Sequence, residues 1–176
     1  MELLVAGENV APELLAGLST LGHAPRVVGV YRAAELPRGA REVGLGLWRV
    51  GDPGNVGALL RSADAFGGCV ALSPGCADPL GPRALRASAG AIFRVPLVGW
   101  DDLPRRRVAL VAHGGVPLAD VDLAPPVAFL LGSEREGLPE GLDGERATIP
   151  LAGHAESLNV AAAGAIALYE LARREA

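Results

Sequence analysis

The stretch GLGLWRVGDPGNVGALLRSADAFG, residues 44–67, runs from an apolar strand through a tight turn into an amphipathic helix. Its mostly apolar beginning predicts a buried strand over Gly44–Val50. After the DPG turn, apolar residues recur at helical spacing, which predicts a helix over Asn55–Phe66 that ends at Gly67. A strand followed by a helix with one apolar face is the repeating unit of a parallel sheet.

The same alternation of short β-rich runs and helical patterns continues toward the C-terminus. It indicates an α/β fold class, with a mainly parallel sheet and helices on both faces. A long last helix is expected, because apolar residues repeat at helical spacing from Leu158 to Ala172 and arginines follow near the C-terminus. The further strands expected are Cys69–Ser73, Phe93–Val98, Arg107–Ala112, Val127–Gly132 and Ala147–Ile149.

Residues 1–42 carry weaker patterns than the rest of the chain. A helix is expected around Pro12–Leu21 and a strand over Arg26–Tyr31, followed by a turn that contains proline and glycine. We find no candidate site there. The chain of 176 residues is therefore expected to divide into a short N-terminal segment, 1–42, and one full α/β domain, 43–176.

Composition argues against a metal site and a membrane span. Cys69 and Cys76 lack the paired spacing of a zinc site, and the three histidines form no H-x-x-x-H pair, so no metal is expected. The longest apolar run, Val160–Tyr169, is too short to cross a membrane. Acidic Glu2 and Glu8 stand where a secretory signal would carry positive charge, which favours a cytoplasmic location.

The formal net charge of −4 means that any RNA-binding surface must be a local basic patch. Every basic residue is arginine, because the chain has no lysine. The arginines expected to form the patch are Arg83, Arg86 and Arg94, with Arg105 to Arg107 as further candidates. The alternative is that these arginines are scattered and solvated.

Three segments combine a strand end, a loop and polar side chains. In the first segment, residues 52–67, each polar residue taken singly has an ordinary explanation. Asn55 is a good helix N-cap, and Arg61 is able to pair with Asp64 at i,i+3. This turn lacks the G-K-[ST] of a phosphate-binding P-loop. Gly44-Leu45-Gly46 likewise lacks the third glycine of a dinucleotide fingerprint.

The second segment, LLGSEREGLP at residues 130–139, places Gly132 at the end of an apolar strand and Glu134 just beyond it. In open parallel sheets ligands bind at this edge, although glycine and glutamate are also common at ordinary strand exits. The third segment, IPLAGHAESLNV at residues 149–160, leads into the last helix, which Ser157 is able to cap. Asn159 is expected inside the first helical turn, where asparagine is unfavourable unless it has a local polar task.

These three segments, in this order and spacing, resemble the three motifs of the SpoU/TrmH family in the SPOUT methyltransferase superfamily. The resemblance covers roughly residues 44–174 and includes the stretch SPGCAD at residues 73–78, with Arg83, Arg86, Ser88, Gly90 and Phe93-Arg94 after it. Each motif alone has an ordinary structural explanation, whereas the ordered set does not.

The resemblance implies a C-terminal trefoil knot, a homodimer, and transfer of a methyl group from S-adenosylmethionine to a ribose 2′-hydroxyl of rRNA or tRNA. It also implies that the N-terminal segment stands where many relatives carry a complete RNA-binding domain, so this segment is expected to be a truncated version of one. The stretch Leu18–His23 resembles the end of such a domain.

By the same resemblance, Asn55, Arg61, Glu134, Ser157 and Asn159 are the expected catalytic residues. Arg61 is the one that would lie beside the 2′-hydroxyl. A guanidinium is a poor base, so Arg61 is expected either to clamp an RNA phosphate or, with local assistance, to act as the general base. The expected cofactor-binding residues are Ala112, His113, Gly114, Leu131, Gly132, Ile149, Pro150, Leu151 and Leu158.

Two alternative functions are considered. The first is a non-catalytic RNA-binding protein that has kept the methyltransferase fold, against which the intact set of motif residues argues. The second is a nicotinamide-dependent oxidoreductase, which the missing G-x-G-x-x-G disfavours.

Overall fold

The computed structural model describes residues 2–18 and 23–175. The chain separates into two compact units, Met1–Leu36 and Pro37–Ala176, and each is described by itself. The boundary between the units lies a few residues before Val43, where the first strand of the large unit begins.

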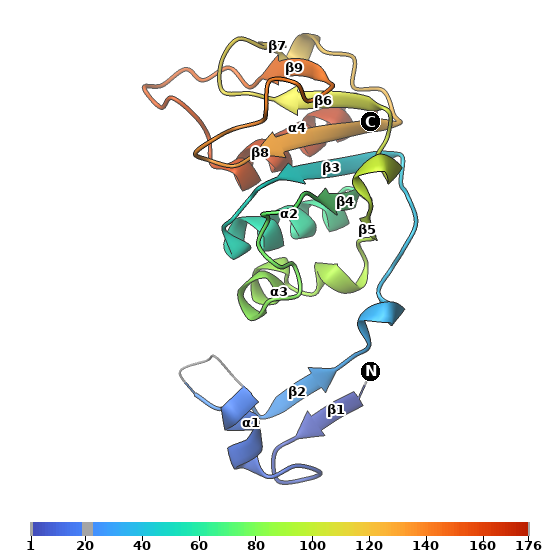
Figure 1. Ribbon diagram of the computed structural model, residues 1–176, viewed down its shortest axis with the longest axis vertical. Helices are drawn as coiled ribbons and strands as arrows, with labels where there is room; N and C mark the ends of the chain where they lie inside the picture. The colour runs from blue at the N-terminus through green and yellow to red at the C-terminus, as the bar shows by residue number, and fades with distance from the viewer. Residues whose placement is uncertain (1, 19–22, 176) are drawn as a thin grey trace. The chain divides into compact units, whose positions relative to one another are not determined.

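A parallel seven-stranded sheet forms the centre of the large unit (Figure 1). Its strands are β3 (Val43–Trp48), β4 (Cys69–Leu72), β5 (Leu97–Val98), β6 (Arg106–Leu110), β7 (Val116–Pro117), β8 (Val127–Gly132) and β9 (Glu145–Thr148). They lie in the order β5-β4-β3-β8-β6-β9-β7. This sheet confirms the predicted α/β fold class with mainly parallel strands.

Three α-helices belong to the same unit, namely α2 (Pro53–Ala65), α3 (Pro82–Ser88) and α4 (Val160–Glu175). α2 packs against both α3 and α4, and α4 also contacts β8. The opposite face of the sheet carries small side chains such as Ala71 and Ala128. A short 3-10 helix, η3 (Trp100–Asp102), and loops cover this face with the side chains of Trp100, Leu103, Leu138 and Leu142.

The path of the C-terminal third is non-sequential. β8 inserts between β3 and the earlier strand β6, β9 pairs on the far side of β6, and α4 then returns to α2. This return is consistent with the path that the expected trefoil knot requires, and the knot itself stays a prediction.

The small unit contains β1 (Glu2–Val5), α1 (Pro12–Leu18), β2 (Val27–Val30) and the 3-10 helix η1 (Ala33–Glu35). β1 and β2 pair antiparallel. Among the described residues of this unit, Leu15 is fully buried. Residues 19–22, the end of the predicted helix Pro12–Leu21 and most of the stretch Leu18–His23, lie outside the described residues.

Two expected elements differ in detail. The predicted strand Phe93–Val98 is instead a 3-10 helix, η2 (Ala91–Phe93), followed by a strand of only two residues. Pro96 lacks a backbone N–H, so it contributes only its carbonyl, which accepts from the N–H of Val70. The predicted helix Asn55–Phe66 begins two residues earlier, because Asp52 is its N-cap and Pro53 occupies its first turn.

Candidate active site

A cavity of about 530 Å³ opens at the carboxyl ends of the central strands, where ligands bind in parallel sheets. Three segments line it: residues 110–112 at the end of β6, residues 131–137 at the end of β8, and the connection between β9 and α4 together with the first turn of α4. Its volume lies within the usual range for small-molecule sites. Its walls combine leucine and isoleucine side chains with Glu134, Ser157 and Asn159, which suits a nucleoside that carries a charged tail.

Most of the residues predicted to bind the cofactor line this cavity. They are Ala112, Leu131, Gly132, Ile149, Leu151 and Leu158. His113, Gly114 and Pro150 do not line it. His113 and Gly114 are exposed in the loop after β6, and the next residue, Gly115, is fixed against β9 by a 3.1 Å hydrogen bond from its N–H to Thr148 Oγ1.

A chain of side-chain hydrogen bonds joins the three sequence motifs. Asn55 Nδ2 donates to Glu134 Oε1, and Asn159 Nδ2 donates to Asn55 Oδ1 over 3.0 Å. Glu134 and Asn159 line the cavity, and Asn55 reaches both from the first turn of α2. Residues separated by 79 and 104 positions in the sequence therefore meet at one site.

The helix caps explain how these side chains become available. Asp52 Oδ1 accepts from the Asn55 N–H over 2.8 Å, so the Asn55 side chain is not needed as the cap of α2. Asn159 precedes α4, and its Oδ1 accepts from the N–H groups of Ala161 and Ala162. The expectations that Asn159 lies inside the helix and that Ser157 is able to cap it are therefore wrong, and Ser157 lines the cavity instead.

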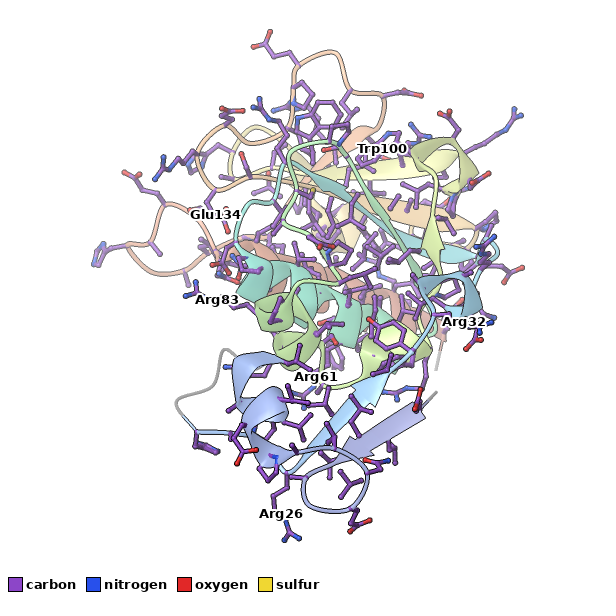
Figure 2. The ribbon with its side chains drawn as sticks, turned by 60° about the horizontal axis from the view of Figure 1, so that its bottom comes forward. Arg26, Arg32, Arg61, Arg83, Trp100 and Glu134 are labelled. Atoms are coloured by element: carbon purple, nitrogen blue, oxygen red, sulfur yellow. The ribbon has the colours of Figure 1, made fainter. Side chains whose placement is uncertain are left out.

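Arg61 lies apart from this network. It is exposed on α2, does not line the cavity, and forms no hydrogen bond or ion pair with another residue that the structure describes. Figure 2 shows Arg61 and Glu134 in separate parts of the molecule. The i,i+3 pair with Asp64 does not form, because that carboxylate binds Arg94 through both of its oxygens.

The three arginines expected to contact RNA are all exposed, but only two are free. Arg83 and Arg86 lie on α3 without a side-chain partner among residues 2–18 and 23–175. The hydrogen bonds and the charge of Asp64 raise the pKa of Arg94 and hold its guanidinium at α2. The described residues contain no group of three His, Cys, Asp or Glu side chains placed to hold a metal ion.

The backbone next to Gly132 leaves no room for a side chain at this position. A Cβ atom on Gly132 would lie 2.2 Å from the carbonyl carbon of Gly137, inside the turn that closes with a bond from the Gly137 N–H to the Ser133 carbonyl. Gly137 adopts a φ of +66°, which glycine allows without strain. The two glycines thus permit the Ser133–Gly137 turn that carries Glu134.

A second hollow of about 480 Å³ shares Ser133–Glu136 with the cavity. Its other walls are Arg49, Gly51, Asp52 and Gly75. Arg49 is not among the residues predicted to form the site. Inside the predicted strand Gly44–Val50 its sequence position carries no signal of a site, whereas in the structure it follows β3 directly, at the edge of the sheet where ligands bind.

None of the described helices is long and apolar enough to span a membrane.

Comparisons with known proteins point to a family of RNA methyltransferases. The model of the SpoU rRNA Methylase family matches residues 42–169. The chain is 36% identical over 190 residues to a 23S rRNA (uridine(2479)-2′-O)-methyltransferase of Streptomyces viridochromogenes, and the match covers 94% of the chain and 66% of that protein. It is 32% identical over 183 residues to an uncharacterized tRNA/rRNA methyltransferase of Synechocystis, covering 94% of the chain and 67% of that protein. The chain thus spans about two thirds of the length of these relatives.

Solved structures give the same result. The SpoU methyltransferase AviRb from Streptomyces viridochromogenes, in complex with the cofactor AdoMet (S-adenosylmethionine), superposes with a TM-score of 0.72 at 30% identity, covering 86% of this chain and 69% of that one. An AdoMet-bound rRNA methyltransferase from Sinorhizobium meliloti superposes with a TM-score of 0.76 at 31% identity, covering 92% and 69%.

Proposed function

The chain belongs to the SpoU rRNA methylase family, and from this premise we propose that it transfers a methyl group from S-adenosylmethionine to a ribose 2′-hydroxyl of rRNA or tRNA. The observation that carries the proposal is the hydrogen-bonded chain of Glu134, Asn55 and Asn159 at the cavity. It brings polar residues of all three motifs to one place, which an ordinary set of helix caps would not do.

The cofactor supplies an electrophilic methyl group on a sulfonium. The apolar side chains of Leu131, Ile149 and Leu158 would hold the nucleoside part of the cofactor, and the carboxylate of Glu134 would supply negative charge near its cation. Asn55 and Asn159 keep that carboxylate in place. As the ribose oxygen forms its bond to the methyl carbon, the carbon–sulfur bond breaks and the hydroxyl proton leaves, so positioning and proton removal are the work of the protein.

We propose that Arg61 serves the 2′-hydroxyl from a second copy of the chain. Arg61 lies outside the cavity of its own chain and has no side-chain partner among the residues that the structure describes. α4 leaves Ile166 and Tyr169 39% and 59% exposed, as an interface helix would in a single copy. A homodimer would bring one protomer's Arg61 to the partner's cavity without any change of fold.

We further propose that the N-terminal unit contributes to RNA binding in the cytoplasm, where rRNA and tRNA act. Its Arg26 and Arg32 side chains are exposed, and Figure 2 shows Arg26 projecting away from β2.

Two measurements test the methyltransferase proposal. Calorimetry is expected to detect binding of S-adenosylhomocysteine, and labelled S-adenosylmethionine is expected to methylate an unmodified 23S rRNA transcript or unmodified tRNA transcripts. Resistance of the modified nucleotide to alkaline cleavage identifies the 2′ oxygen as the acceptor. A protein that binds these RNAs but not S-adenosylhomocysteine would instead be a non-catalytic RNA-binding member of the family.

A further inference from the structure

Arg49 adopts a backbone conformation that arginine rarely tolerates. It follows β3 directly, and its φ of +53° lies in the left-handed region. Among the residues that the structure describes, Ala89 is the one other non-glycine residue with a positive φ. Such strain persists only where the surroundings impose it, and it gathers at functional sites.

The surroundings of Arg49 hold both its backbone and its side chain. Its N–H donates to Ser73 Oγ over 2.9 Å at the end of β4. The side chain runs beside Gly75, where a Cβ atom would lie 3.4 Å from Arg49 Cγ and Nε. The backbone strain therefore serves to aim the guanidinium across the second hollow, toward the Ser133–Gly137 turn.

The guanidinium ends on a carboxylate that is easily replaced. Arg49 Nη1 donates to Glu136 Oε2 over 2.8 Å, and the two side chains are 53% and 62% exposed. An ion pair this exposed stabilises a protein little, because water screens it and both side chains lose freedom. A phosphate offers the same acceptor geometry as the carboxylate, and arginine binds either through its planar fork.

Of the other charged groups that face the hollow, the two carboxylates already accept hydrogen bonds within the protein, and the remaining arginine would attract an anion. Asp52 caps α2, and Glu134 accepts from Asn55. Arg135 also lines the hollow and has no side-chain partner in the described part of the chain. Glu136 is therefore the carboxylate that competes with an incoming anion for Arg49.

The hollow and the cavity share the wall Ser133–Glu136. A ribose whose 2′ oxygen reaches the cavity at this wall would have its adjoining phosphate on the side of the hollow. We propose that Arg49 binds a backbone phosphate of the acceptor RNA, and that Glu136 holds its guanidinium until the phosphate displaces it. This proposal rests on the proposed function, because it takes the shared wall as the place where the acceptor ribose meets the methyl donor.

The decisive variant is Arg49→Gly, because glycine removes the guanidinium and accepts a positive φ without strain. The unfolding midpoint is expected to stay the same or rise, and the affinity for S-adenosylhomocysteine to be unchanged. Affinity for an unmodified 23S rRNA transcript or for tRNA transcripts is expected to fall on the order of tenfold at low salt. The slope of log K against log salt is expected to become shallower by about 0.7–0.9, the loss of one phosphate contact.

Two further variants complete the test. Glu136→Gln removes the competing carboxylate and is expected to tighten RNA binding. Ala89→Gly relieves the same kind of backbone strain without changing charge, so RNA affinity and salt slope should match the wild type.

Some results would overturn the proposal. An Arg49→Gly protein with the wild-type salt slope would show that Arg49 makes no phosphate contact. Lost affinity for S-adenosylhomocysteine, with RNA binding retained, would place Arg49 in the cofactor site instead. Failure of the proposed function is seen separately, in the wild type, as RNA binding without S-adenosylhomocysteine binding or methyl transfer.

Discussion

Asn159 performs two tasks with one side chain, and a single substitution separates them. Asn159→Asp keeps an oxygen for the cap of α4 but loses the Nδ2 donor to Asn55 and adds a charge close to Glu134. Because aspartate caps helices as well as asparagine, stability should change by less than about 0.5 kcal/mol. Turnover is expected to fall about 10²-fold, as for loss of a positioned hydrogen-bond donor.

The matched control is Asn159→Ala, which removes cap and donor together and should cost about 1 kcal/mol more in unfolding free energy. Chemical denaturation and single-turnover methylation measure the two effects. Wild-type turnover in Asn159→Asp would remove the Asn55–Asn159 bond from the mechanism.

Gly132 leads to a corrected explanation for a predicted residue. The family resemblance implies that Gly132 binds the cofactor, whereas a Cβ atom on Gly132 would point into the backbone of Gly137. Gly132→Ala is therefore expected to displace the Ser133–Gly137 turn, so that affinity for S-adenosylhomocysteine and thermal stability fall together. A loss of affinity at unchanged stability would contradict this and restore direct contact with the ligand as the reason for the glycine.

At the scale of elements, the crossing of α2 over α3 depends on Gly57. A Cβ there would lie 2.4 Å from the Ala84 carbonyl oxygen and 2.5 Å from Ala87 Cβ. Gly57→Ala should destabilise the protein by about 1–3 kcal/mol, because backbone must move to admit the methyl group. Gly17→Ala in α1 has open space and should stabilise its helix slightly. Denaturant unfolding of both variants checks these opposite signs.

The end of α4 is fastened by Glu170, which accepts hydrogen bonds from Arg173 and Arg174. Arg174 also donates to the carbonyls of Leu118, Ala119 and Val121. The hydrogen bonds from Arg173 and then Arg174 lower the pKa of Glu170 from 4.5 to about 2. The stabilisation is therefore complete above pH 4.5 and is lost as the pH falls toward 2.

Glu170→Gln is expected to flatten the fall of the unfolding midpoint between pH 4.5 and pH 2. Asp122 also has a lowered pKa, through the Ala124 N–H and Arg106, so Asp122→Asn should remove a separate part of the same acid dependence. Thermal unfolding across this pH range tests both. An unchanged acid profile in Glu170→Gln would show that the pairs do not persist in solution.

On the scale of the whole molecule, the local patterns predicted the elements better than their edges. The SpoU/TrmH family is confirmed, as is the mainly parallel sheet. The strands β1 and β7 were missed, because neither shows an alternating pattern and each depends on its partner strand. The cap residues were misplaced because several polar residues stood near each helix start, and only tertiary contacts select one.

The candidate site was predictable as a set of residues but not as a geometry. The motifs named Asn55, Glu134 and Asn159, which the fold brings together. No period or spacing predicts that Asp64 pairs with Arg94 and not with Arg61, since Arg94 and Asp64 are 30 positions apart. Arg49 was missed for the same reason, because its partner Glu136 lies 87 positions away.

The proposed homodimer yields a test that depends on the whole assembly. Arg61→Ala should keep fold and cofactor affinity while turnover falls on the order of 10²–10⁴-fold, and Arg61→Lys should rescue it poorly. If Arg61 serves the partner's cavity, mixing inactive Arg61→Ala with inactive Glu134→Gln protomers should restore about a quarter of wild-type activity, because half of the dimers are mixed and each holds one intact site. A monomer by sedimentation at micromolar concentration, or a mixture that stays inactive, would contradict the shared site.

The common wall Ser133–Glu136 has an energetic consequence for the order of binding. The Ser133–Gly137 turn lines both spaces and has one conformation at a time. A ligand in the cavity that restricts the conformation of this turn therefore also restricts the wall of the hollow. The two occupants are then thermodynamically coupled through a few backbone torsions. Whatever factor RNA adds to the affinity for S-adenosylhomocysteine, S-adenosylhomocysteine must add to the affinity for RNA.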